Sequence, residues 1–176
     1  MAKTKNKDVN EIQVFEDFTD EEVMTISKYS EKKFYQRDEI VFEEKTKDAS
    51  LYVVLKGRLQ AFAHTEEGEK IPLSYIEQGE VFGELSFLDG KQRSATILAV
   101  ADVELLQLTR KKFEDLTKKF PVISSKLIMD LARVVSLRLR NADKFIVEIF
   151  QLINKDKQAS KAPKKATAKK EDKKAA

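Results

Sequence analysis

Residues 81–97 read Val-Phe-Gly-Glu-Leu-Ser-Phe-Leu-Asp-Gly-Lys-Gln-Arg-Ser-Ala-Thr-Ile, and this stretch combines the features of a small anion-binding pocket. Gly83 lets a ligand approach the backbone without a side chain in the way. The short run after it can form a helical turn whose first N–H groups lack intrahelical partners. Arg93 offers a planar fork for phosphate oxygens. Glu84, when ionised, only accepts hydrogen bonds and therefore needs a donor such as a sugar hydroxyl. Together these residues indicate a ribose phosphate as the ligand.

The same residues resemble the phosphate-binding cassette of the cyclic nucleotide-binding domain family, which includes catabolite activator protein, cyclic AMP-dependent kinase regulatory subunits and gated channels. The family pattern, Phe-Gly-Glu-Leu and then Arg-Ser/Ala-Ala-Thr, stands here at residues 82–85 and 93–96. The resemblance implies that Glu84 holds the ribose 2′-hydroxyl, that Arg93 binds the exocyclic phosphate oxygens and that Ser94 adds a hydroxyl. The implied ligand-binding residues are Phe82, Gly83, Glu84, Leu85, Ser86, Arg93, Ser94, Ala95, Thr96 and Asn141.

Two alternatives remain open at this site. Residues 141–143 stand where the activator has a Thr-Ser pair facing the base, so the sequence does not decide between cyclic AMP and cyclic GMP. In addition, Glu84 and Arg93 could pair with each other in a pocket that has lost its ligand. The presence of both charges favours binding, because a degenerate pocket tends to lose a costly buried charge.

Composition excludes several classes of protein. The chain has 176 residues, 41% of them hydrophobic, no cysteine and one histidine, His64. One domain with tails is therefore expected, and disulfides, thiolate zinc sites, cysteine catalysis and a histidine-rich metal centre are excluded. His64 is expected to face solvent on a strand. We find no P-loop and no group of catalytic residues beside the pocket, so we expect no enzyme.

The chain pattern predicts an α+β fold, mainly β: an antiparallel jelly-roll barrel with an N-terminal helix and C-terminal helices. Thr19 and Glu22 form a capping box for a helix from about Asp20 to Ser30. The predicted strands are 39–42, 51–55, 59–63, 71–76, 97–100 and 103–108. The resemblance covers 15–141 and departs at Arg37, where many family members have a turn glycine.

A long helix is predicted after the barrel. Thr109 begins a first helix, and Pro121 interrupts it and starts a second. The second helix has the apolar series Ile128, Leu131, Val135, Leu139, Ala142, Ile146, Ile149 and Ile153, which is close to a coiled-coil seam. A helix of about 25 residues is nearly 40 Å long, which exceeds one side of a small barrel. We therefore expect its distal part, 142–154, to form a homodimer, as in the activator, rather than pack within the chain.

Residues 155–176 contain nine lysines and three acids, so their net charge is 9 − 3 = +6. This composition predicts a disordered tail that either keeps the protein soluble or contacts nucleic acid or another polyanion without reading sequence. We therefore expect no helix-turn-helix domain after the long helix. Residues 1–14 are expected to be flexible. We find no secretory signal and no run of 18 apolar residues, so we expect a cytoplasmic protein without membrane insertion.

These features predict a noncatalytic regulatory module that binds cyclic AMP or cyclic GMP and transmits binding to its C-terminal helices and an unidentified protein effector. The alternative is a ligand-independent dimeric scaffold with a polyanion-binding tail.

Overall fold

The computed structural model describes Phe15 and residues 17–161, with side chains as far as Lys155. The N-terminal segment 1–14 and the part of the predicted tail from residue 162 onward lie outside the described residues, so both predictions stay untested there.

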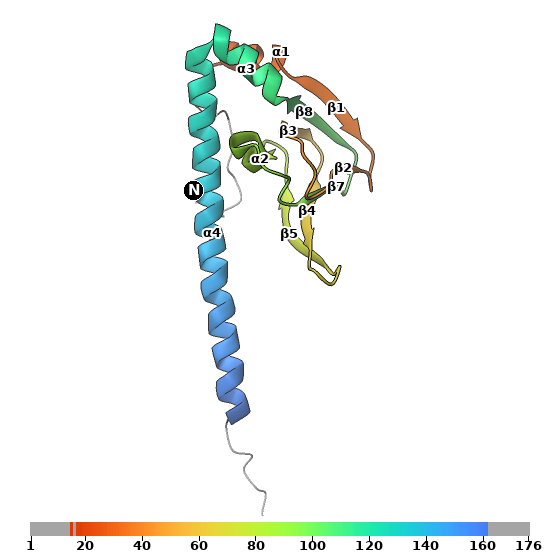
Figure 1. Cartoon of the computed structure of the whole chain (residues 1–176), viewed down its shortest axis with the longest axis vertical. Coiled ribbons are helices and arrows are strands. Elements are labelled where there is room, and N and C mark those ends of the chain that lie inside the picture. Colours follow the sequence, from red (N-terminus) through yellow and green to blue (C-terminus); the bar gives the residue numbers. More distant parts are fainter. Residues whose placement is uncertain (1–14, 16, 162–176) are drawn as a thin grey trace, which may run out of the picture. The chain divides into compact units, whose positions relative to one another are not determined.

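The described residues form four helices and eight strands (Figure 1). In chain order they are α1 Asp20–Lys28, β1 Glu31–Tyr35, β2 Ile40–Phe42, β3 Leu51–Lys56, β4 Leu59–His64, β5 Lys70–Ile76, β6 Val81–Phe82, α2 Glu84–Asp89, β7 Thr96–Ala99, β8 Val103–Leu108, α3 Arg110–Lys119 and α4 Pro121–Lys161.

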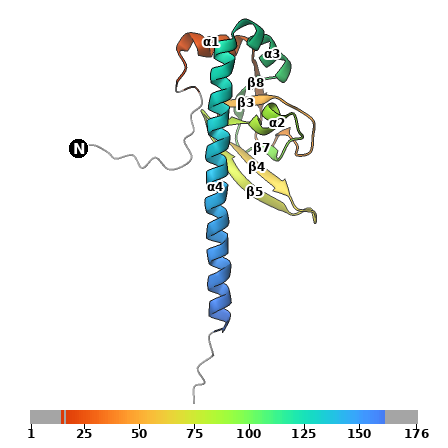
Figure 2. The ribbon, with the colours of Figure 1, turned by 60° about the vertical axis from the view of Figure 1, so that its left-hand side comes forward.

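The strands make two antiparallel four-stranded sheets, in the orders β1-β8-β3-β6 and β2-β7-β4-β5. This is the predicted double-sheet jelly roll, and the α+β prediction is confirmed. The further prediction that the fold is mainly β fits the chain only loosely, because α4 alone has 41 residues. Figure 2 shows β4 and β5 as a hairpin beside the other strands.

Local signals place the helices where the sequence predicts them. Thr19 caps α1, and the reciprocal bonds of the capping box with Glu22 are both present. The Thr109 side chain accepts a hydrogen bond from the amide of Lys112 and so caps α3. Pro121 is the first residue of α4, where its missing N–H costs nothing.

Strand β3 separates two buried clusters and has an apolar side chain for each. Leu51 belongs to the cluster formed with the helices, which also contains Phe87, Leu116 and Leu131. Tyr52 belongs to the second cluster, which fills the space between the two sheets. Because both faces of β3 are covered, its sequence is a continuous apolar run instead of an alternating one.

Two strands and one turn were not predicted. β1 begins before Phe34, in a charged and mostly exposed segment that has no apolar alternation. β6 has only two residues. At the turn after β1, where Arg37 replaces the family glycine, the left-handed conformation falls on the next residue, Asp38, with φ 68°. Aspartate tolerates this conformation better than most residues do, so the turn forms without glycine.

The first compact unit ends at Ser136 within α4. In this unit Leu127, Leu131 and Val134 bury one side of the helix in the first cluster. The predicted seam residue Leu131 therefore contacts the helix's own domain. The predicted dimer contact concerns only the distal part, 142–154, and stays a prediction.

The second unit begins at Leu137 and contains the distal part of α4. From Leu137 to Lys155 none of the described side chains is buried. The helix continues to Lys161, so the prediction of a disordered tail from Lys155 is wrong for residues 155–161. Lysine, which supplies residues 155, 157 and 161, has a high helix propensity and can extend a helix without burial. Among the described residues no helix has the length and hydropathy needed to cross a membrane.

The two sides of α4 in the first unit predict different effects of substitution. Leu131→Ala removes a fully buried side chain and should lower the free energy of unfolding by about 2–5 kcal/mol. Met129→Ala, at a neighbouring position that is 60% exposed, should change it by less than about 0.5 kcal/mol. Denaturant unfolding of both variants checks this, and equal losses would contradict the described packing.

Candidate functional site

The cassette is built on a sharp turn between β6 and the short helix α2. Gly83 caps α2 in the left-handed conformation, with φ 78°, and this allows the chain to leave β6 and start the helix at once. A Cβ atom at Gly83 would lie 2.5 Å from Nη1 of Arg93 and 2.8 Å from the carbonyl oxygen of Ser50. The glycine is therefore needed for both its conformation and the close approach of Arg93.

Arg93 lies beneath this turn, and its side chain is 1% exposed. Nη1 donates to the carbonyl of Gly83 at 3.0 Å and to the Ser86 hydroxyl at 2.6 Å. Nη2 donates to the Asp48 carboxylate at 2.6 Å and to the carbonyl of Ser50 at 2.7 Å. A guanidinium has four Nη hydrogens, so acceptors of the protein engage all of them.

Aromatic rings form the surface beneath the guanidinium. Its central carbon lies 3.9 Å from the ring centroid of Phe42, within cation–π range. Phe42 in turn contacts Tyr52 and Phe82, whose rings stack with centroids 5.0 Å apart. Nε of Arg93 is buried and has no hydrogen-bond partner among the described residues. One polar donor of this buried side chain is thus unsatisfied among the described residues.

Asp48 supplies the negative charge next to Arg93. Burial opposes its ionisation, but hydrogen bonds from Arg93 and Ser50 outweigh burial and keep the pKa of the Asp48 carboxyl below its usual value. The Asp48 side chain remains 37% exposed. The carboxylate is therefore a charged partner that still has access to solvent.

The structure brings most of the predicted site residues together. Phe82, Glu84, Ser86, Arg93 and Thr96 are all at most 3% exposed. Leu85 is 44% exposed, Ser94 is exposed and Ala95 is half-buried. Asn141 lies in the second unit, so its predicted position at the base stays a prediction.

Thr96 has a structural role in addition to the predicted one. Its hydroxyl accepts a hydrogen bond from the amide of Glu44 at 3.1 Å and so fixes the segment after β2 to β7. No local sequence pattern indicates this contact, because the two residues are 52 positions apart.

The interactions of Asp48 with Arg93 and of Phe42 with Arg93 were not predicted either. Asp48 is 45 residues away from Arg93 in the chain, and no local pattern links them. A weaker signal exists within Asp48-Ala49-Ser50: the Asp48 carboxylate accepts from both the amide and the hydroxyl of Ser50. This is an Asx-type turn before a strand, which marks Asp48 as an ordered residue.

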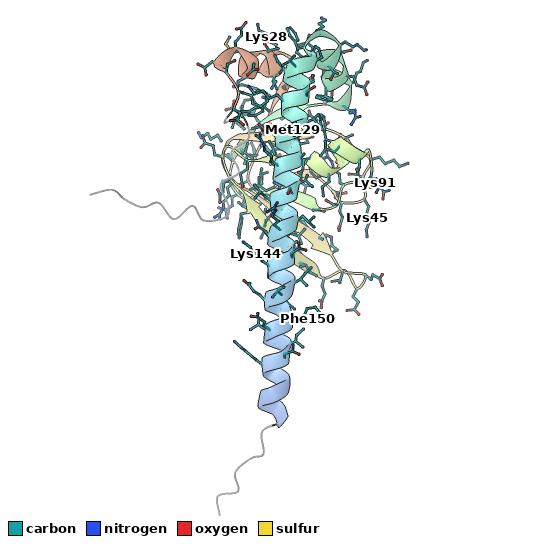
Figure 3. The ribbon with its side chains drawn as sticks, turned by 90° about the vertical axis from the view of Figure 1, so that its left-hand side faces the viewer. Lys28, Lys45, Lys91, Met129, Lys144 and Phe150 are labelled. Atoms are coloured by element: carbon teal, nitrogen blue, oxygen red, sulfur yellow. The ribbon has the colours of Figure 1, made fainter. Side chains whose placement is uncertain are left out.

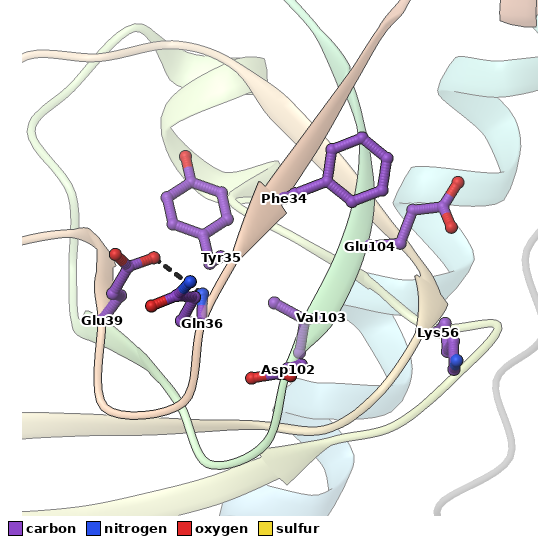
Figure 4. Close-up of a pocket in the computed structure, with 8 residues that line it drawn as sticks. All are labelled: Phe34, Tyr35, Gln36, Glu39, Lys56, Asp102, Val103 and Glu104. Atoms are coloured by element: carbon purple, nitrogen blue, oxygen red, sulfur yellow. Dashed lines mark hydrogen bonds between the residues drawn. The ribbon is translucent and has the colours of Figure 1, made fainter.

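Two surface hollows lie near the sheets. One, of about 540 Å³, is lined by residues that include Phe34, Lys56 and Glu104 (Figure 4). The other, of about 390 Å³, is lined by residues that include Thr96, Glu44 and His64.

His64 lies at the exposed end of β4, as predicted, and its Nδ1 atom is 2.6 Å from the Glu44 carboxylate. This contact is the main cause that lowers the pKa of Glu44.

The fold is an eight-stranded jelly roll, and its candidate site is the buried Arg93 beneath the Gly83 turn. The family model "Cyclic nucleotide-binding domain" matches residues 32–120. The chain therefore belongs to the cyclic nucleotide-binding domain family.

Known proteins agree with this assignment. The "Cyclic AMP receptor protein" of Thermus thermophilus is 34% identical over 130 residues, covering 74% of this chain and 58% of the relative. The crystal structure of the Thermus thermophilus catabolite activator protein has a TM-score of 0.69 and 31% identity, covering 77% of this chain and 62% of that one. The crystal structure of a cyclic nucleotide-binding domain from Methylobacillus flagellatus has a TM-score of 0.71 and 25% sequence identity, covering 80% of this chain and 79% of that one. The chain spans less than two thirds of both Thermus proteins.

The buried aromatic cluster predicts an unusual titration of Tyr52. Burial, with a smaller effect of Asp48, raises the pKa of Tyr52 from 10.0 to about 12. The unfolded chain should then lose this proton before the folded one does, so stability should fall by roughly 2–3 kcal/mol as pH rises from 10 to 12. An absorbance titration of tyrosinate should show a last step near pH 12 that Tyr52→Phe lacks. Completion near pH 10 in the folded protein would contradict this environment.

Proposed function

We propose that the protein is a noncatalytic sensor of a cyclic nucleotide, with the phosphate at Arg93 and the ribose at Glu84. The observation that carries the proposal is the buried guanidinium beneath the Gly83 turn, together with membership of the family. The Nε donor of Arg93 and the amides from Gly83 to Ser86 and at Ala95 would hold the phosphate. Glu84 would accept from the ribose 2′-hydroxyl.

Cyclic AMP is the first candidate ligand, and cyclic GMP the second. The name of the Thermus thermophilus relative specifies cyclic AMP. The cassette motif, by contrast, would bind the ribose and the phosphate, which the two nucleotides share, and so does not distinguish between them. Ser94 is exposed at the cassette and would add a hydroxyl at the phosphate for either nucleotide. Asn141 would contact the base.

The phosphate would compete with Asp48 for Arg93. Both are anions, and Nη2 of Arg93 has two hydrogens, which Asp48 and the carbonyl of Ser50 already engage. Asp48 is the partner that can leave at low cost, because it is partly exposed and water can solvate it. Binding would thus exchange one charge-assisted contact of Arg93 for another and free the 48–50 turn.

Phe87 would transmit the change of partner at Arg93 to the C-terminal helices. It lies in α2, one residue after Ser86, and is fully buried in the cluster with Leu127 and Leu131 of α4. Its ring also meets Phe113 of α3 edge to face, with centroids 5.1 Å apart. A ligand can shift this arrangement only by binding one of two states more tightly.

The remaining assignments concern partners and place. We expect a cytoplasmic homodimer formed by the distal part of α4 (142–154), a protein effector of unknown identity and no membrane insertion. The lysine-rich segment 155–176 would contact nucleic acid or another polyanion without sequence preference.

A ligand-independent dimeric scaffold is the second candidate function. One observation favours it: acceptors of the protein engage all four Nη hydrogens of Arg93, so the site is largely satisfied by itself. In this case the long helix and the lysine-rich segment would carry the function.

Calorimetric titration with cyclic AMP and cyclic GMP separates these two functions. We expect micromolar or tighter binding of at least one nucleotide. Arg93→Ala should cost about 2–5 kcal/mol, thirtyfold or more in affinity, because it removes a charge-assisted contact to phosphate.

Arg37→Ala is the matched control, since this arginine has a side chain that is 73% exposed and lies in the turn after β1. It should bind as the wild type does. A folded wild-type protein that is silent with both nucleotides, or an Arg93→Ala variant with unchanged affinity, would favour the scaffold.

Asp48→Asn tests the competition for Arg93. The variant keeps the shape of the side chain but removes the charge that the phosphate must displace. We expect roughly three- to tenfold tighter nucleotide binding and a lower melting temperature of the ligand-free protein. Weaker binding, measured in the same titration, would show that Asp48 supports the bound state instead.

A further inference from the structure

The distal part of α4 contains an unusually apolar segment, residues 145–153, with the sequence Phe-Ile-Val-Glu-Ile-Phe-Gln-Leu-Ile. Seven of these nine residues are apolar, and their exposures run from 39% at Ile149 to 64% at Phe150. Figure 3 shows Phe150 projecting from this part of the helix. A solvent-exposed surface of this kind normally marks an interaction site.

The heptad positions that carry apolar side chains differ between the proximal and distal heptads of the helix. Leu139, Ala142, Ile146, Ile149 and Ile153 occupy the a and d positions of a continuous seam. In the proximal heptads the flanking e and g positions are polar: Ser136, Arg138 and Asp143. In the distal heptads they are Phe145, Phe150 and Leu152. We call the a, d, e and g residues from Phe145 to Ile153 the broad face.

The broad face is too wide for a two-stranded coiled coil. At 3.6 residues per turn its six side chains span about 160° of the helix surface, whereas an a/d seam is a narrow stripe. In two-stranded coiled coils the e and g positions are usually charged, and isoleucine at both a and d favours three or four strands. Ile146, Ile149 and Ile153 follow this second pattern.

The apolar surface that a dimer would leave exposed also indicates more than two strands. A dimer that buries only the a/d seam would leave Phe145, Phe150 and Leu152 at its flanks, and these are 63%, 64% and 61% exposed. A phenylalanine can bury roughly 150–250 Å². The dimer would therefore keep several hundred Å² of clustered apolar surface, as much as the largest patch on a typical monomer.

We propose that the broad face assembles four copies of this chain into a four-helix bundle, as a dimer of the proposed dimers. The inference rests on the proposed dimerisation of α4 but is independent of nucleotide binding. Another copy suits the face better than a lipid surface does, because the broad face continues the a/d seam of Leu139 and Ala142 without a break in register. A helix partner matches that register, and a lipid surface does not require one.

The test is sedimentation equilibrium of the full chain over a concentration series. The chain mass is 20.2 kDa, so we expect about 81 kDa (4 × 20.2 kDa) at the upper concentrations. Phe145→Gln/Phe150→Gln should reduce this to about 40 kDa (2 × 20.2 kDa). Leu137→Gln/Val147→Gln is the matched control: it removes two exposed apolar side chains of the same helix from the f and b positions and should remain a tetramer.

Each other outcome overturns the four-copy assembly. If the wild-type protein is a dimer at all concentrations, the tetramer is wrong and only the proposed dimer stands. If it is a monomer, both the dimer and the tetramer are wrong. A dimer that co-sediments with vesicles of anionic phospholipid would assign the broad face to lipid. Equal dissociation of both double variants would show that the face is not specific. Calorimetry with cyclic AMP on the same samples shows separately whether the nucleotide site is intact.

Discussion

A guanidinium with a 1% exposed side chain cannot keep its water shell, so the protein must supply acceptors for its N–H groups. Around Arg93 these acceptors come from two separate segments: the cassette turn, with the carbonyl of Gly83 and the Ser86 hydroxyl, and residues 48–50, with the Asp48 carboxylate and the carbonyl of Ser50. One side chain therefore joins 48–50 to the cassette turn, and the backbone of Arg93 also forms hydrogen bonds with Lys45 and Thr46. Removing that side chain leaves several buried acceptors unsatisfied.

The same constraint links the site to the rest of the fold. β3 begins next to Ser50 and carries Leu51 toward the helices and Tyr52 toward the space between the sheets. α2 begins next to Gly83 and buries Phe87 against α3 and α4. Each element that supplies an acceptor to Arg93 is thus also packed in the core, and α2 connects the site to the proximal part of α4 through the packing of Phe87.

Sequence patterns predict the features that local chemistry encodes. The capping box at Thr19, the cap at Thr109, Pro121 at the start of α4 and six of the eight strands are all set by residues close in sequence. β1 is not predicted, because charged, exposed residues can pair in a sheet without an apolar alternation. The helix ends at Lys161 and not near residue 154 as predicted, because a segment whose composition cannot form a core still has the helix propensity to extend a helix.

The candidate site divides in the same way. Phe82, Gly83, Glu84 and Arg93 could be identified because the cassette is a short local motif. Asp48, Phe42 and Tyr52 could not, because only the folded sheets bring them to Arg93. Local reasoning thus identifies the buried Arg93 but not the partners that it needs, because these are distant in the chain.

The central claim is that Arg93 changes its anionic partner when the ligand binds. A crystal structure of the full chain with bound cyclic AMP tests this most directly, through the distance between Nη2 of Arg93 and the Asp48 carboxylate, which is 2.6 Å here. We predict that this distance lengthens beyond hydrogen-bonding range and that a phosphate oxygen takes the place of the carboxylate. An unchanged contact with Asp48 in the presence of bound nucleotide would contradict the account.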